Sequence, residues 1–312
     1  MKINFLHHPL DETHKFEDPV VLAMGFFDGV HLGHQEVINT AKKIADDLGV
    51  KLAVLTYDHH PALVYKKLSQ HDKKYLTLKD EKMRIFKELG VDQVFVVNYS
   101  YKFQDQSPQE FVDNYLVRFN AVTVVAGFDH TYGEKSIANM ENLASLAKGR
   151  FDVVTVNPIL ENEIKVSSTN IRKALDKSNV TLANKYLGRT FQTTGLIVHG
   201  DQRGRILGFP TINIEHDERQ WLPGIGEYVV EVKIGDRVYQ GMGSIGRNVT
   251  FEPNRPVTVE INLFDFNENV YGENVTIRWH KYLRGEIKFD SADELIKQLH
   301  QDEIVARNFF IN

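Results

Sequence analysis

Apolar residues in the first half of the chain follow two alternating patterns, short continuous runs and helical spacing. The continuous runs predict buried strands at 20–24, 52–57, 94–97, 122–126 and 153–156. Apolar residues that recur every three or four positions predict helices at 35–48, 76–89, 108–119 and 140–147. Short apolar strands separated by helices are typical of a parallel sheet with both faces covered. We therefore predict a doubly wound α/β domain with its ligands at the carboxyl ends of the strands.

In the second half, apolar and polar residues alternate over short stretches. This pattern predicts strands at 194–199, 211–214, 227–234, 238–242, 257–266 and 274–282. Turn residues separate these strands, which favours a small antiparallel β-barrel. A helix is predicted at 291–307, where Ser291 can be the N-cap and Glu294 completes a capping box. Because 171–187 looks helical, we place the boundary within it and predict domains at 1–184 and 185–312.

The first predicted strand and helix are joined by a glycine-rich turn, MGFFDGVHLGH at 24–34. Backbone N–H groups and the positive end of the helix point at one place in such a turn, which suits a phosphate group. The glycines leave room for a ligand to approach the backbone. The candidate nucleotide-binding residues of this turn are Gly25, Phe26, Asp28 and Gly33. His31 and His34 can place two imidazoles beside the phosphate.

Two other interpretations of this turn stay open. Any doubly wound domain needs a glycine-containing turn between strand and helix, so the stretch can be purely structural. Metal binding is the second option, but a zinc-protease helix places its histidines four apart with a glutamate between them. Here His31 and His34 are three apart, and no third ligand is evident.

Reactive side chains also follow other predicted strands. Asp129 follows the strand at 122–126, and the sequence VSSTNIR at 166–172 follows the last strand. The candidate phosphate-binding hydroxyls of this last stretch are those of Ser167, Ser168 and Thr169, any of which can also cap the next helix. Arg172 can hold phosphate with them. The structural alternative is a capped surface helix with a solvated arginine.

Histidines at a phosphate site without an acidic metal cluster fit the transfer of a nucleotidyl group. That reaction requires mainly the positioning of two substrates and the neutralisation of charge on phosphate oxygens. We expect His31 and His34 to contact the phosphates of ATP and Arg172 to take charge on the leaving pyrophosphate.

Two predicted strands of the barrel carry a second set of candidates. Thr211 and Asn213 are two positions apart, so their oxygens leave one face of a strand and suit a hard cation that also holds phosphate. Glu260 alternates with apolar residues on another strand. On the inner face of a barrel a carboxylate needs a partner or a function, such as that of a general base. The periodicity equally allows Glu260 to face solvent outside the barrel.

A glycine- and arginine-rich stretch at 195–205 precedes these strands. Gly200, Gly204 and Arg205 could cradle nucleotide phosphates, although the stretch does not match the P-loop pattern. Hairpin loops often use glycine as well, so the signal is weak by itself.

Composition argues against several classes of protein. The 312 residues suggest two domains, and 42% hydrophobic with 25% charged residues is ordinary for a globular chain. A net charge of −5 gives no general support for nucleic-acid binding, and the absence of cysteine excludes disulfides and thiolate metal sites. No apolar run approaches the ~20 residues of a membrane span, and the N-terminus lacks the apolar core of a signal peptide. We therefore expect a cytoplasmic protein.

Four stretches together resemble the prokaryotic bifunctional riboflavin kinase/FMN adenylyltransferase (FAD synthetase) family. They are FFDGVHLGH at 26–34, VSSTNIR at 166–172, GRILGFPTINI at 204–214, and VEINLFDF at 259–266 followed by Tyr271-Gly272. The resemblance spans residues 20 to 307. It implies a barrel that phosphorylates riboflavin with ATP and magnesium to give FMN. It also implies a nucleotidyltransferase-like first domain that adenylylates FMN with ATP to give FAD and pyrophosphate.

The resemblance also implies roles for single residues of the barrel. Thr211 and Asn213 match the family's magnesium and phosphate residues, and Glu260 matches its catalytic base. Arg307 matches an arginine near the flavin site.

In the first domain, His31 and His34 match the family's nucleotidyltransferase histidine pair. The stretch from Ser167 to Arg172 matches its phosphate-binding segment. Asp129 matches an acid or amide position of the family pattern, which we assign to flavin binding.

The chain departs from the family pattern at several positions. His59 stands in place of a proline, and His130 in place of the first phenylalanine of an Asp-Phe-x-Phe-Gly pattern. In the kinase half, Asn262 stands where histidine is common, and Ser244 and Val249 replace a usual asparagine and proline. Two other functions therefore stay open. One is a riboflavin kinase whose first domain is weak or redirected to another nucleotide transfer, and the other is a flavin- or nucleotide-binding regulator without turnover.

Overall fold

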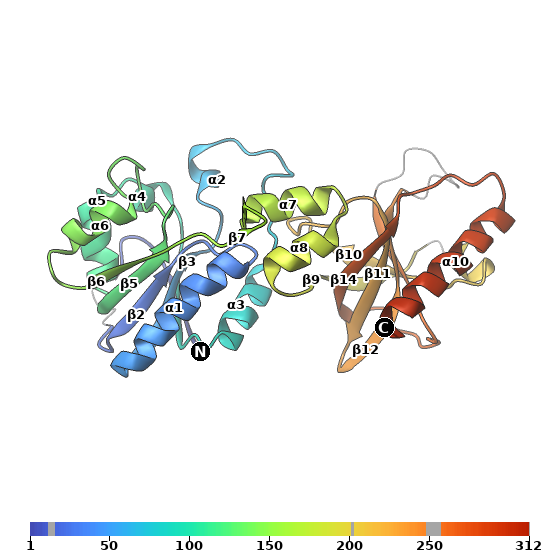
Figure 1. Ribbon diagram of the computed structural model, residues 1–312, viewed down its shortest axis with the longest axis horizontal. Coiled ribbons are helices and arrows are strands. Elements are labelled where there is room, and N and C mark those ends of the chain that lie inside the picture. The colour runs from blue at the N-terminus through green and yellow to red at the C-terminus, as the bar shows by residue number, and fades with distance from the viewer. Residues whose placement is uncertain (12–15, 201–202, 248–256, 312) are drawn as a thin grey trace. The chain divides into compact units, whose positions relative to one another are not determined.

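The computed structural model describes residues 1–11, 16–200, 203–247 and 257–311. The chain divides into two compact units, Met1–Ser167 and Ser168–Asn312. Figure 1 shows a β-sheet flanked by helices in the first unit and a β-barrel in the second. This architecture confirms the predicted fold class. Val249 lies outside the described residues.

The first unit is built on a six-stranded parallel sheet in the order β1-β4-β3-β2-β5-β6. Its strands are β1 (Lys2–Leu6), β2 (Val20–Met24), β3 (Lys51–Tyr57), β4 (Gln93–Val97), β5 (Ala121–Gly127) and β6 (Asp152–Val156). From β2 the chain adds strands on one side and, after β4, returns to add β5 on the other. The carboxyl end of β2 therefore lies at the point where the strand order reverses, which is where such sheets bind ligands.

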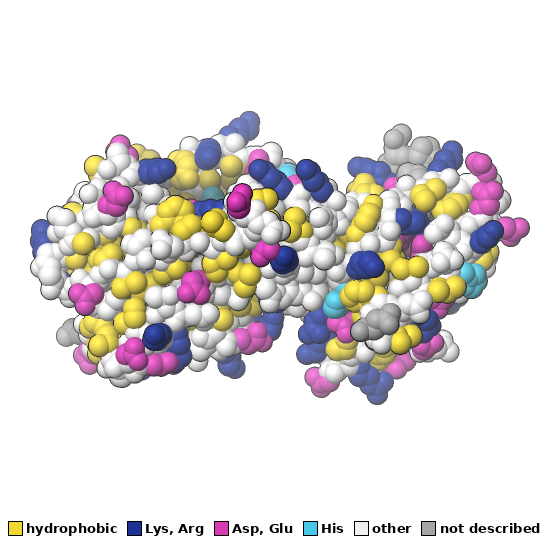
Figure 2. All heavy atoms as spheres, viewed as in Figure 1, with side chains coloured by type: hydrophobic (Ala, Val, Ile, Leu, Met, Phe, Trp, Pro, Cys, Tyr) yellow, Lys and Arg dark blue, Asp and Glu magenta, His cyan; other side chains and the backbone are white. Residues whose placement is uncertain are grey.

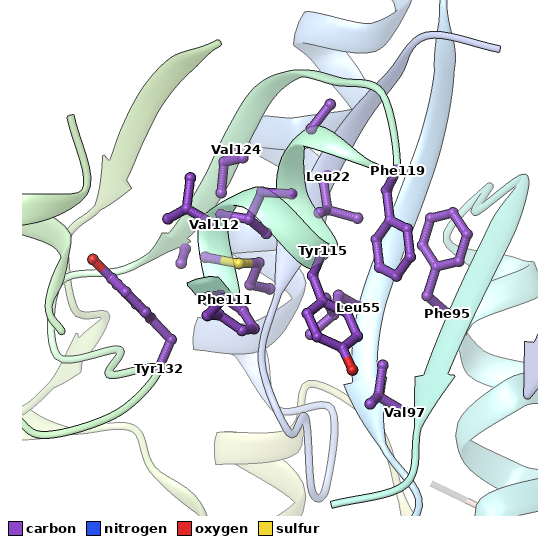
Figure 3. Close-up of a cluster of buried hydrophobic side chains, with 14 of the residues drawn as sticks. Leu22, Leu55, Phe95, Val97, Phe111, Val112, Tyr115, Phe119, Val124 and Tyr132 are labelled. Atoms are coloured by element: carbon purple, nitrogen blue, oxygen red, sulfur yellow. The ribbon is translucent and has the colours of Figure 1, made fainter. Parts of the chain in front are cut away.

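Helices cover both faces of this sheet. On one face, α1 (Leu32–Leu48) and α3 (Lys79–Glu88) bury Val37, Ile38 and Phe86 against the sheet. On the other face lie α4 (Tyr101–Gln104), α5 (Pro108–Phe111), the π-helix η1 (Val112–Val117) and α6 (Met140–Ala147). Figure 3 shows side chains of α5 and η1 packed on Leu22 and Leu55. Both faces of the central strands are thus buried, as their continuous apolar sequence predicts.

The helix predicted at 108–119 is α5 followed directly by η1. The hydroxyl of Ser107 accepts a hydrogen bond from Glu110 N at 3.2 Å, and the Glu110 carboxylate accepts one from Ser107 N at 2.8 Å. This reciprocal capping box confirms Ser107 as the N-cap.

In the first unit, four short elements and one edge strand were not predicted. The short ones are α2 (Ala62–Tyr65), α4, and the hairpin strands β7 (Leu160–Glu161) and β8 (Ile164–Lys165), all with too few residues to show a period. Strand β1 pairs with β4 alone, and its Phe5 side chain is 63% exposed. Its sequence therefore lacks the continuous apolar run of its neighbours.

The second unit begins with two helices, α7 (Ser168–Asp176) and α8 (Val180–Leu187). The stretch 171–187 is helical as predicted, except for a break between α7 and α8. Ser178 adopts a φ of 59°, and the Asn179 side chain accepts a hydrogen bond from Leu182 N at 3.1 Å. Asparagine competes with the helix backbone in this way, so α7 ends and a new helix starts.

The rest of this unit is a closed antiparallel barrel in the order β10-β13-β12-β11-β14-β9. Its elements are β9 (Phe191–Val198), α9 (Arg203–Ile206), β10 (Ile212–His216), β11 (Gly226–Ile234), β12 (Arg237–Gly246), β13 (Thr258–Leu263), β14 (Asn274–Arg284) and the helix α10 (Ala292–Ile311). Ala306 of α10 is buried with Val229 and Met242, which lie on the outer face of the barrel wall. Before α10, the Ser291 hydroxyl accepts a hydrogen bond from Glu294 N at 3.3 Å, which confirms Ser291 as the N-cap. The Glu294 carboxylate accepts from Asp290 N at 3.3 Å, one residue before the position that the predicted capping box requires.

Glu227 of β11 gives the barrel a pH-dependent stability. Burial raises the pKa of its carboxyl from 4.5 to about 7, and the Ser244 hydroxyl donates a hydrogen bond to it at 2.9 Å. The folded chain thus keeps a proton that the unfolded chain releases above pH 4.5. The stability that this proton provides is complete at lower pH and is lost as pH rises through about 7.

We expect Glu227→Gln to remove this dependence, since glutamine stays neutral and still accepts from Ser244. The free energy of unfolding of the barrel should rise by up to about 3 kcal/mol at pH 8 and change little at pH 5. Calorimetric unfolding at the two pH values measures this, with the exposed Glu215→Gln as control. An equal effect of Glu227→Gln at both pH values would contradict the assignment.

Candidate active sites

The turn after β2 has a strained backbone. Phe27 and Val30 have positive φ angles of 56° and 39°, and Gly29 has a φ of 84°. Such angles are rare for bulky residues and persist where the surroundings hold them in place. The Asp28 carboxylate does so here, because it accepts hydrogen bonds from the backbone N–H groups of Leu76 at 3.0 Å and Thr77 at 3.2 Å.

The two predicted histidines lie together at the start of α1. His31 is the N-cap, and its Nδ1 accepts a hydrogen bond from His34 N at 3.3 Å. The two imidazole rings are stacked with centroids 3.6 Å apart. At Gly33, a Cβ atom would lie 3.3 Å from the His31 ring and 3.7 Å from the carbonyl oxygen of Val166. The turn, the histidine pair and the chain leading to Ser167 therefore meet at one place.

This arrangement suits an anion. The positive end of a 17-residue helix and two imidazoles face the same region. Among the residues that the structure describes, no group of three His, Asp or Glu side chains could hold a metal ion.

The remaining predicted residues of the adenylyltransferase site fall in both units. Asp129 follows β5 and forms an ion pair with Lys165, whose ammonium lies 4.6 Å from the centroid of the Phe128 ring. Ser168 and Thr169 open α7 in the second unit. In that unit the Arg172 guanidinium lies over the Trp221 ring at 5.3 Å. The phosphate-binding roles of Ser167, Ser168, Thr169 and Arg172 stay predictions.

In the barrel, the predicted kinase residues come together on adjacent strands. Asn213 of β10 lies directly opposite Glu260 of β13. The Thr211 hydroxyl is 3.5 Å from one Glu260 oxygen, and the Thr258 hydroxyl is 3.4 Å from the other. A hydroxyl, an amide and a carboxylate thus share one small surface.

The structure also decides which face of the barrel Glu260 occupies. Its neighbours Val259 and Ile261 are buried inside the barrel, so Glu260 points outward. It is nevertheless only partly exposed, because the side chains of Thr211 and Thr258 flank it. The carboxylate stays accessible to a substrate without the cost of burial inside the barrel.

The glycine-rich stretch packs against these same residues. A Cβ atom at Gly200 would lie 2.2 Å from the Asn213 side chain. At Gly204 it would lie 2.3 Å from the Phe209 carbonyl oxygen and 3.5 Å from the Thr211 hydroxyl. Close approach therefore requires glycine at both positions. Residues 201 and 202 lie outside the described residues.

Two neighbouring cavities meet at Pro210, and one of them reaches Thr211. One has a volume of about 640 Å³ and is lined by Arg205, Thr211 and the loop at 266–271. The other measures about 360 Å³ and lies between the same loop and α10, with Arg307 in its wall. Pro210, Leu263, Phe266 and Asn267 line both. Volumes of this size suit small-molecule ligands, so the barrel has room for two adjacent substrates.

Arg307 is held in place by several contacts. Its guanidinium forms a bidentate ion pair with Asp265 at 2.8 and 3.0 Å and an ion pair with Glu303 at 2.8 Å. It also lies 4.4 Å from the centroid of the Phe264 ring. The other cavity residues of α10, His300 and Glu303, were missed from the sequence, because helical periodicity gives no sign of which polar residues face a cavity.

Comparisons with known proteins match each half of the chain to a separate enzyme family. The FAD synthetase family model matches residues 13–170, and the riboflavin kinase family model matches 187–310. Relatives described as bifunctional riboflavin kinase/FMN adenylyltransferase include proteins from Listeria monocytogenes, 43% identical over 99% of this chain and 98% of its own, and Bacillus subtilis, 38% identical over 100% and 99%. The Escherichia coli K12 relative is 33% identical over 94% of each chain.

A solved structure from Streptococcus pneumoniae shares the whole fold. It is 35% identical with a TM-score of 0.90, and the match covers 97% of this chain and 99% of that one. That protein is described as a macrolide-efflux protein. In the described part of the present chain, no helix has the length and apolar character needed to cross a membrane.

A nucleotidyltransferase-like domain with a histidine pair, followed by a kinase barrel, defines a two-domain nucleotide-dependent transferase. The two family models match in that same order. The chain belongs to the bifunctional riboflavin kinase/FMN adenylyltransferase family of flavin cofactor synthesis.

The packing of Gly200 on Asn213 gives a direct test of the barrel site. We expect Gly200→Ala to displace the Asn213 side chain and to slow riboflavin phosphorylation about 10- to 100-fold, since small displacements of positioning groups are costly. Gly285→Ala is the matched control, because its Cβ would make only ordinary contact, 3.4 Å from the Tyr282 hydroxyl. Steady-state assays measure the kinase rates of both variants. A Gly200→Ala variant as active as Gly285→Ala would contradict the assignment.

Proposed function

We propose that the chain converts riboflavin to FAD in two ATP-dependent steps, with the kinase site in the barrel and the adenylyltransferase site in the first domain. The observation that supports this proposal is the presence of two separate clusters of side chains whose chemistry suits phosphate, the stacked His31 and His34 and the group of Thr211, Asn213 and Glu260. We keep the functional domains at 1–184 and 185–312, a boundary that falls between the two matched family regions.

In the kinase step, Glu260 accepts the proton of the riboflavin 5′-hydroxyl while that oxygen attacks the γ-phosphorus of ATP. The bond from the γ-phosphorus to the bridging oxygen breaks, and ADP leaves. Partial exposure of Glu260 on the outer face of the barrel allows direct contact with the hydroxyl, as general-base catalysis requires.

The oxygens of Thr211 and Asn213 fit a magnesium ion, because they are hard ligands that lie beside the Glu260 carboxylate. When bound, the ion would neutralise charge on the phosphates of ATP. Gly200, Gly204 and Arg205 would hold the phosphate chain in the larger cavity. The smaller cavity, with Arg307, would hold the flavin.

In the adenylyltransferase step, a phosphate oxygen of FMN attacks the α-phosphorus of ATP, and pyrophosphate leaves. His31 and His34 stabilise the negative charge on the transferring phosphate, and Arg172 neutralises the pyrophosphate. Gly25, Phe26, Asp28 and Gly33 shape the nucleotide site, and Ser167, Ser168 and Thr169 bind phosphate. Asp129 binds the flavin.

We further propose that the partners of the chain are small molecules and that it works in the cytoplasm, where both steps have access to ATP. A mixed surface supports the absence of nucleic acid as a partner. On the face that Figure 2 shows, basic and acidic side chains are interspersed over each unit. The net charge of −5 also gives no basic excess for phosphate backbones.

Two substitutions should separate the reactions. His31→Ala is expected to lower FAD formation from FMN by about 100- to 1000-fold, because charge on the transferring phosphate loses a stabilising group, and to leave FMN formation unchanged. Glu260→Gln should lower FMN formation from riboflavin by about 100- to 10,000-fold and spare FAD formation from supplied FMN. Chromatography of the flavin products, with riboflavin and FMN offered separately, measures both.

Each variant serves as the control for the other. Loss of both reactions in His31→Ala would contradict two separate sites. Unchanged FMN formation in Glu260→Gln would show that another group is the base.

A further inference from the structure

A buried lysine lies beneath the turn that carries the histidine pair. Lys82 of α3 is only 5% exposed, although it stands in the charged sequence Lys-Asp-Glu-Lys at 79–82. Its ammonium donates hydrogen bonds to the Phe26 carbonyl oxygen at 3.1 Å and to the Thr56 hydroxyl at 3.4 Å. It also lies 4.6 Å from the centroid of the Phe26 ring. Nothing in the proposed reaction uses this cation.

These contacts converge on one residue of the turn. The Thr56 hydroxyl donates a further hydrogen bond to the Phe26 carbonyl oxygen at 3.0 Å, so this oxygen accepts twice. The peptide that contains this carbonyl leads directly into Phe27, whose φ of 56° begins the strained part of the turn. Lys82 thus ties α3 and β3 to the peptide on which the positions of His31 and His34 depend.

The Phe26 ring extends this connection to the loop after β3. Its centroid lies 5.1 Å from that of His60 and 6.0 Å from that of Tyr75, and the Tyr75 hydroxyl accepts a hydrogen bond from His60 N at 3.3 Å. A cation over one aromatic ring favours a fixed ring position. The ammonium therefore acts on both the carbonyl and the ring of Phe26.

A buried ammonium is costly unless its charge has a function. Burial lowers the pKa of Lys82 to about 8, while the carboxylates of Asp28 in the turn and Asp58 after β3 oppose this shift. Lys82 is thus protonated near neutral pH and loses its charge in mildly alkaline solution.

We propose that Lys82 is a positioning residue for adenylyl transfer, whose ammonium holds the Phe26–His31 turn in its active conformation. When that charge is removed, by substitution or at alkaline pH, the turn loses its attachment to α3, and adenylyl transfer slows. Riboflavin phosphorylation, in the other unit, does not depend on this charge. The inference rests on the proposed assignment of adenylyl transfer to the first domain.

The test compares Lys82→Met and Lys82→Arg in the full chain. For each, kcat and KM for FAD formation from FMN and for FMN formation from riboflavin are measured at several pH values on both sides of 8. Lys87→Met is the matched control, because Lys87 lies on the same helix and is exposed.

In the unsubstituted chain, kcat for FAD formation should fall as pH rises through about 8. Lys82→Met should lower this kcat at least ~10-fold at neutral pH, with no further fall near pH 8. In Lys82→Arg, which keeps its charge, the alkaline fall should be absent. FMN formation and the Lys87→Met control should match the unsubstituted chain in both respects.

Two results would overturn the proposal. One is Lys82→Met with FAD formation within two-fold of the control at every pH. The other is an active Lys82→Arg variant whose kcat for FAD formation falls at alkaline pH as in the unsubstituted chain. This second result decides the question even if Lys82→Met does not fold. His31→Ala is assayed in parallel to separate failure of the site assignment from failure of the positioning role of Lys82. If it leaves FAD formation intact, the assignment of the site fails, and if only the Lys82 variants behave like the control, the positioning role fails.

Discussion

The first domain depends on the strained turn between β2 and α1. Phe27 and Val30 adopt backbone angles that their side chains disfavour, and such strain persists only where several contacts hold it. The Asp28 carboxylate fixes the turn from one side through the N–H groups of Leu76 and Thr77, and Lys82 fixes it through the Phe26 carbonyl. With the turn in place, His31 caps α1, and its ring stacks on that of His34. The protein's own contacts therefore fix the position of the histidine pair.

The barrel holds its reactive side chains in place by other means. Its interior is apolar, so the reactive groups Glu260, Thr211 and Asn213 lie on the outer face, where they are partly exposed and Thr211 lines the larger cavity. Gly200 brings the glycine-rich stretch so close to Asn213 that a Cβ atom there would displace the Asn213 side chain. One domain uses backbone strain and buried charge, and the other uses the alternation of side chains along its strands.

The sequence was most informative where one physical requirement dominates. The four central strands β2 to β5 were predicted because both of their faces are buried, and the shared face of Thr211 and Asn213 follows from strand geometry. It was least informative where tertiary contacts decide. The break at Ser178 depends on a local cap, the outward direction of Glu260 depends on how the barrel closes, and the burial of Lys82 is hidden within a charged stretch that looks solvent-exposed. Periodicity also gave no sign that Arg172 would lie over Trp221.

One experiment shows whether a single chain carries both reactions. The purified protein is incubated with riboflavin, ATP and magnesium, with and without a reductant, and the flavins are separated by chromatography over time. We expect FMN to form first and FAD to follow from it. FMN as the final product under both conditions would show that the first domain does not adenylylate FMN.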